Sequence, residues 1–191
     1  LGHISIDDVF RFYSHVLRAK AKDRSKEIGL RKFYAGNGEY TRLKQSGVMD
    51  DILALANFWY YVNTSNEPED EDGYIISNET RKYLHCLSHY ANEFWRYSTS
   101  VFFLKNKTND TFDDDLKEFL KKLTAFLFVK FIDAPTVNAI KDDIYNVCIS
   151  IQDGLGFDRT YNLDELKLKD KIDEQSSSRL MRPLLLLDAY L

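Results

Sequence analysis

Residues 112–127 read FDDDLKEFLKKLTAFL, and this stretch decides the fold class of the chain. Its apolar side chains recur every three or four positions, which places them on one face of an α-helix. These side chains are Phe112, Leu116, Phe119, Leu120, Leu123, Phe126 and Leu127. Three consecutive aspartates, Asp113 to Asp115, stand near the expected start of the helix, where the helix dipole favours negative charge. The stretch therefore predicts a long amphipathic helix.

Working outward, helical patterns cover most of the remaining sequence. The first helix is expected to begin at Ser5, which forms a capping-box spacing with Asp8. Further helices are predicted over residues 48–62, 78–102, 135–151 and 179–191. The 48–62 helix is apolar nearly all round, which is typical of a helix at the centre of a bundle. The 78–102 helix is expected to bend near Ser98-Thr99-Ser100, where hydroxyl groups compete for backbone hydrogen bonds.

The glycine and proline content agrees with a helical fold. The chain of 191 residues has 8 Gly and 3 Pro, too few for the many tight turns of a β-sandwich or barrel. We therefore predict an all-α, irregular multi-helix bundle, with one short extended segment at residues 157–163.

The succession of predicted helices indicates a single helical domain over residues 1–191. Within it we expect an exposed acidic loop at residues 67–73, a charged connector at 153–178, and a helix starting at 179–191. Because the sequence opens without Met and closes on an apolar run, we expect a fragment of a longer protein, with the 179–191 helix leading to a downstream domain.

Composition excludes several classes of protein. The only cysteines, Cys86 and Cys148, lie far apart, which fits reduced thiols in a cytoplasmic protein and excludes a disulfide scaffold. The most apolar stretches are shorter than the roughly 18 residues that indicate a membrane span, so no membrane partner is expected. The sequence also has no nucleophile-elbow or phosphate-loop motif, and Cys148 falls on an apolar stripe. We expect no catalysis by this segment and no cofactor in it.

A divalent-metal site is one alternative that the sequence leaves open. His85, His89 and Glu93 follow one another at four-residue spacing and offer two nitrogens and an oxygen. A zinc-protease motif needs Glu directly after the first His, and Cys86 stands there instead. Solvated or hydrogen-bonded histidines are the ordinary interpretation of this pattern, and a metal-dependent hydrolase is the competing one.

Residues 18–32, called here the basic segment, carry a local excess of positive charge in a chain whose net charge is −4. Only Asp23 and Glu27 oppose its cations. Clustered Lys and Arg can follow a nucleic-acid backbone, whereas the alternative is a solvated helix end. The candidate contacts are Arg18, Lys20, Lys22, Arg24, Lys26, Arg31 and Lys32. Tyr34 and Tyr40 follow and could add stacking.

Several helical segments resemble one family. They are residues 9–13 (VFRFY), 22–34 (KDRSKEIGLRKFY), 55–59 (LANFW), 92–97 (NEFWRY) and 179–191 (RLMRPLLLLDAYL). Together they resemble the helical middle region of GmrSD-type bacterial defence proteins. In that family a ParB/sulfiredoxin-like nucleotide-hydrolysing domain precedes this region and a His-Asn-His nuclease domain follows it. The resemblance implies a parent protein that restricts modified or phage DNA using a nucleoside triphosphate and a divalent metal.

The family's catalytic motifs are absent from these 191 residues. There is no Asp-Gly-Gln-Gln-Arg motif, and the histidines stand at positions 3, 15, 85 and 89, well before the end that would lead into the nuclease. The resemblance therefore implies a non-catalytic connector that holds its flanking NTPase-like and nuclease domains and contacts the DNA backbone. The alternative is a stand-alone helical module that binds another protein.

Overall fold

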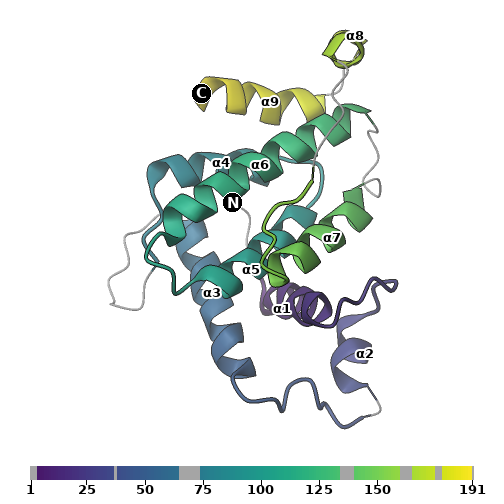
Figure 1. The fold of residues 1–191 in the computed structure, drawn as a ribbon, viewed down its shortest axis with the longest axis vertical. Helices are drawn as coiled ribbons and strands as arrows, with labels where there is room; N and C mark the ends of the chain where they lie inside the picture. The colour runs from purple at the N-terminus through teal and green to yellow at the C-terminus, as the bar shows by residue number, and fades with distance from the viewer. Residues whose placement is uncertain are drawn as a thin grey trace.

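The computed structural model describes residues 4–36, 38–64, 74–133, 140–159, 165–174 and 178–190. Within these ranges the chain is helical and contains no strand, which confirms the predicted all-α multi-helix bundle (Figure 1). The helices are α1 (Ile6–Lys20), α2 (Leu30–Ala35), α3 (Val48–Thr64), α4 (Asn78–Ser88), α5 (Phe94–Asn106), α6 (Phe112–Asp133), α7 (Lys141–Gln152), α8 (Glu165–Glu174) and α9 (Ser178–Tyr190).

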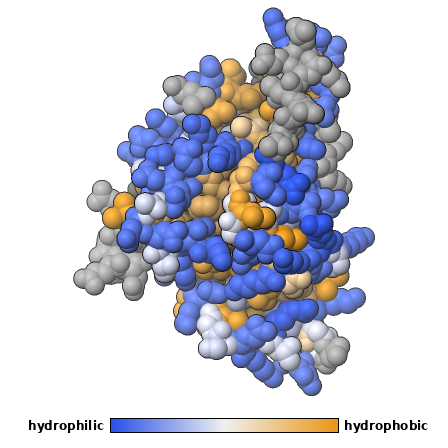
Figure 2. All heavy atoms as spheres, in the orientation of Figure 1, coloured by the Kyte–Doolittle hydropathy of each residue, from blue (hydrophilic) through white to orange (hydrophobic). Residues whose placement is uncertain are grey.

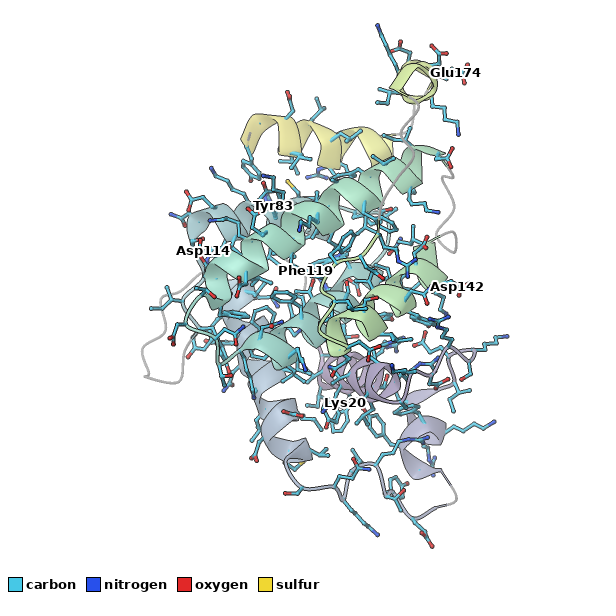
Figure 3. All side chains as sticks on the ribbon, viewed as in Figure 1. Lys20, Tyr83, Asp114, Phe119, Asp142 and Glu174 are labelled. Atoms are coloured by element: carbon cyan, nitrogen blue, oxygen red, sulfur yellow. The ribbon has the colours of Figure 1, made fainter. Side chains whose placement is uncertain are left out.

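Local signals predicted α1 and α6 correctly. The Ser5 hydroxyl accepts the Asp8 N–H at 3.3 Å, and the Asp8 carboxylate accepts the Ser5 N–H at 2.9 Å, which completes the capping box. In α6, all seven apolar positions of the predicted stripe are buried. Phe119, labelled in Figure 3, stacks on Phe102 of α5 with ring centroids 4.5 Å apart.

The predicted helix over residues 78–102 is divided, and the predicted position of its bend is wrong. The break falls at residues 89–93, between α4 and α5, and not at Ser98 to Ser100. The Asn92 side chain accepts the Phe94 N–H at 3.0 Å, so it satisfies a backbone donor at the start of α5. The hydroxyl residues lie instead inside α5, and each of them is fully buried.

α5 is the central helix of the bundle. It packs against α1, α3, α6 and α7, while α4 packs against α6 (Figure 1). Ser98 and Thr99 donate to the Trp95 carbonyl at 3.1 and 2.9 Å, and Ser100 accepts the indole N–H of Trp59 at 2.9 Å. Small side chains let neighbouring helices approach closely, and these hydrogen bonds satisfy their polar atoms.

α3 was predicted at the centre, and the structure places it at one edge. One face packs against α1 and α5 through Leu55, Phe58 and Trp59, which are buried. The opposite face exposes Met49, Leu53 and Tyr60, each by more than half of its surface. The prediction was wrong because apolar residues on all sides of a helix allow it to be buried all round. They do not require other helices to surround it.

The C-terminal part adds two peripheral helices. Inside the predicted 153–178 connector, α8 packs against α6, and Lys171 pairs with Asp133 at 2.6 Å. α9 packs against α4 and α6, as Figure 1 shows. Residues 157–159 of the predicted extended segment form no strand. The rest of that segment and the predicted acidic loop at 67–73 lie outside the described residues.

Hydrophilic side chains cover most of the face shown in Figure 2, with apolar atoms between them. Among the helices described, none combines the length and the apolar character that crossing a membrane requires.

Candidate nucleic-acid interface

After α1, the basic segment makes a left-handed turn, crosses the surface and continues into α2. Lys22 adopts a positive φ of 53°, and the N–H of Asp23 donates to the Arg18 carbonyl at 2.9 Å. This closes the C-terminal turn of α1 in a conformation usually reserved for Gly or Asn. Residues 23–29 then cross the surface without regular structure, and α2 begins at Leu30.

Three of the seven predicted contact residues are engaged within the protein. Arg18 is buried, donates to the Ser25 carbonyl, and lies over the Tyr145 ring at 5.2 Å. Lys20, labelled in Figure 3, lies 3.8 Å from Asp51, and Lys22 lies 2.7 Å from Asp153. Arg18 is therefore a structural residue, and each of the two lysines has a carboxylate partner at the surface.

The other four, Arg24, Lys26, Arg31 and Lys32, are exposed. None of them has a carboxylate within 4 Å among the residues that the structure describes. We call these four residues the free cations. They lie on one short stretch. The free positive charge of the 15-residue basic segment is therefore concentrated on residues 23–29, called here the crossing, and on the first turn of α2.

Glu27 anchors this stretch to the bundle. Its carboxylate accepts the Tyr145 hydroxyl at 3.3 Å and lies 3.4 Å from the Lys141 ammonium, both on α7. The imidazole of His15, 3.8 Å away on α1, and the Lys141 ammonium hold the pKa of Glu27 at about 2. Burial lowers the pKa of His15, whereas the neighbouring Glu27 carboxylate acts in the opposite direction.

Aromatic packing fixes the two ends of the crossing. His15 is buried and stacks on Tyr97 at a centroid distance of 3.8 Å. The Tyr34 hydroxyl of α2 donates to the Phe10 carbonyl of α1 at 2.6 Å, so Tyr34 is a core residue and not a stacking platform. Tyr40 keeps 41% of its surface exposed. The free cations therefore stand on a braced unit.

Sequence reasoning missed the Glu27 cluster. In the sequence Glu27 is only a negative charge within the basic segment, because its partner Tyr145 is 118 positions away. Only a weak signal for this cluster is present in the sequence. It consists of one acidic residue among cations, and of Lys141 and Tyr145 on another predicted helix.

The structure separates the candidate metal ligands. His85 and His89 lie together at the end of α4, with their Nε2 atoms 3.3 Å apart. Glu93 belongs to the start of α5 and pairs with Arg96 at 3.3 Å. Across the described residues, no three His, Cys, Asp or Glu side chains are placed to hold one metal ion.

Both thiols are free and buried. Burial raises the pKa of Cys86 to about 11 and raises that of Cys148 as well. Thiols held protonated in this way are poor nucleophiles at neutral pH.

Comparisons with protein-family models, with curated proteins and with solved structures find no match for this chain.

Proposed function

We propose that this chain is a non-catalytic helical module that contacts the phosphate backbone of DNA through the four free cations. The observation that carries the proposal is their arrangement: four exposed positive side chains without carboxylate neighbours, on a stretch that Glu27 and Tyr34 hold to the bundle. A braced unit presents its charges without a large loss of conformational entropy on binding.

Electrostatics favours this stretch over the rest of the surface. The chain carries a net charge of −4, which repels DNA on average, so binding requires a local concentration of positive charge. Each phosphate contact releases counterions and adds about −0.9 to the slope of log affinity against log salt. Four contacts predict a slope of roughly −3 to −4.

We further propose the setting that the resemblance to GmrSD-type defence proteins implies. In that setting the module connects an upstream nucleotide-hydrolysing domain to a downstream His-Asn-His nuclease, in the cytoplasm, and α9 (Ser178–Tyr190) leads toward the nuclease. The five similar segments support this placement. The module's role is then to hold the two active domains while the basic segment contacts DNA.

Fluorescence anisotropy with a short labelled duplex tests the DNA contact. We expect weak, sequence-independent binding that falls steeply with salt, and at least tenfold weaker binding when Arg24, Lys26, Arg31 and Lys32 become Ala. The matched control changes Lys82, Lys105, Lys121 and Lys122 to Ala. It removes the same charge from exposed lysines elsewhere and should keep most of the affinity. Equal losses in the two variants would show that net charge alone governs binding.

A second candidate function, binding another protein, is favoured by the outer face of α3. Met49, Leu53 and Tyr60 are separated by four and seven residues, so they line one face of the helix, and each is more than 50% exposed. An exposed apolar stripe of this kind is a feature of interaction surfaces. This function expects no salt-dependent DNA binding, and expects Leu53→Ser to weaken capture of the partner.

A further inference from the structure

Two histidines at the end of α4 direct nitrogen atoms at each other. α4 ends at Ser88, and His89 is its C-cap residue, so His85 and His89 lie one turn apart on the same side. Their Nε2 atoms are 3.3 Å apart, and the rings meet edge to face at 77°. If one ring donates to the other, the hydrogen bond is a long one.

The separation also matches that of two ligands on one metal ion. Zinc binds imidazole nitrogen at about 2.0–2.1 Å in tetrahedral geometry, which places two nitrogen ligands about 3.3–3.4 Å apart. The apo arrangement therefore already has the spacing of two ligands on one tetrahedral ion. Both side chains are partly exposed, so an ion can reach them from solvent.

A third residue orients the pair from another helix. The other ring nitrogen of His85, Nδ1, lies 2.6 Å from the hydroxyl of Tyr190 in α9. Histidines that bind metals commonly donate their second ring N–H to an oxygen, which fixes the tautomer and leaves the lone pair free for the metal. Tyr190 can accept in this way, and it also lines a groove of about 260 Å³ among α4, α6 and α9.

We propose that His85 and His89 bind one transition-metal cation of the zinc class through their Nε2 atoms, with Tyr190 holding His85 in the metal-binding tautomer. Imidazole suits zinc and its neighbours better than magnesium or calcium, which prefer oxygen ligands. Water or solute molecules complete the coordination. Both ligands belong to the end of α4, and the His85–Tyr190 contact connects them to α9. This inference is independent of the proposed DNA contact.

Arg182 of α9 places a positive charge near His89. The same Arg182 charge opposes a second cation, so two protein ligands beside it predict modest affinity and not a tightly retained ion.

Calorimetric titration of the chain with Zn²⁺ tests the site. We expect one zinc ion per chain, a higher Tm with zinc that EDTA reverses, and loss of both in His85→Gln and in His89→Gln. Tyr190→Phe should weaken zinc binding about tenfold or more while both ligands remain. Replacing zinc with Co²⁺ should give the intense visible absorption of tetrahedral coordination.

The competing results are equally definite. No zinc uptake by the wild-type chain, or uptake that both histidine variants retain, would overturn the site. Unchanged affinity in Tyr190→Phe would overturn the role of Tyr190. Circular dichroism of the metal-free variants separates loss of a ligand from loss of fold, and Tyr190→Phe, which removes neither ligand, provides a test if a histidine variant unfolds.

Discussion

At the scale of single residues, Glu27 connects the candidate interface to two helices of the bundle. His15 approaches it from α1, Lys141 and Tyr145 from α7, and together they surround one carboxylate with groups that favour its charged form. The anchor therefore links the crossing between α1 and α2 to both of the helices beneath it.

The low pKa of Glu27 makes this anchor dependent on pH. A carboxylate whose pKa is about 2 in the folded chain and about 4.5 when unfolded stabilises the fold above pH 4.5 and loses that contribution toward pH 2. We expect Glu27→Gln to lower the free energy of unfolding by about 1–2 kcal/mol near pH 7. This loss is smaller than the pKa difference alone implies, because solvent partly screens the site. The difference from the wild type should shrink near pH 3. Urea unfolding at the two pH values measures it.

Glu39→Gln is the matched control for this experiment. Glu39 is exposed in the following loop, so its substitution should change the free energy of unfolding by less than about 0.5 kcal/mol. A Glu27→Gln penalty that grows toward acid pH would contradict the assigned sign.

Residues differ in how far their roles can be predicted from sequence. The Ser5–Asp8 capping box spans three positions and follows from local spacing alone. The Glu27–Tyr145 contact depends on how α1 and α7 pack, which no local pattern encodes. Arg18 illustrates the consequence: its charge suggested DNA, whereas its neighbours Ser25 and Tyr145 make it part of the core.

At the scale of elements, α5 shows that polar residues within a helix neither break it nor place it at the surface. Its Ser98-Thr99-Ser100 run predicted a bend in the helix, yet residues 95–103 are all buried. Two of the three hydroxyls return hydrogen bonds to the helix's own Trp95 carbonyl, and the third receives the Trp59 indole from α3. Only the last of these hydrogen bonds joins two helices.

This difference predicts unequal effects of one substitution at two buried sites. Ser100→Ala leaves the Trp59 N–H buried without its partner and should lower the free energy of unfolding by about 1–3 kcal/mol. Ser98→Ala removes a bond within the helix and should cost less than about 0.5 kcal/mol. Both variants gain the same helix propensity, so the difference between their urea midpoints reports the interhelical bond. Equal midpoints would mean that the Trp59 bond contributes nothing.

Periodicity predicts an element better than it predicts that element's neighbours. The 112–127 pattern located α6 and its buried face because amphipathicity encodes one interface. α3 has apolar residues on every side, so its sequence did not show that Met49, Leu53 and Tyr60 would face outward. At the break before α5 the Asn92 side chain accepts the Phe94 N–H, but Asn92 stands beside other polar residues, such as His89 and Glu93, and nothing in the sequence distinguishes it.

At the scale of the whole molecule, the contacts are distributed unevenly. α5 meets four other helices, whereas α8 packs against α6 and is held there by the Lys171–Asp133 pair (Figure 1). The candidate interface belongs to the closely packed part of the molecule. Glu27 ties the basic segment to α1 and α7, and both of these helices pack on α5. We therefore expect the free cations to stand on a stable part of the fold.

This distribution predicts an order of local stability that native-state hydrogen exchange can measure. None of the α8 side chains described, residues 169–174, is buried, so opening α8 exposes little apolar surface. Its amides should exchange with an opening free energy at least about 2 kcal/mol below that of α5, whose amides should open only with global unfolding. The amides at the end of α1 should be protected to nearly the level of α5, because Arg18, Glu27 and α7 cover that turn. Exchange at the end of α1 as fast as in α8 would show that Glu27 does not brace the basic segment, and the entropic argument for DNA contact by the free cations would then fail.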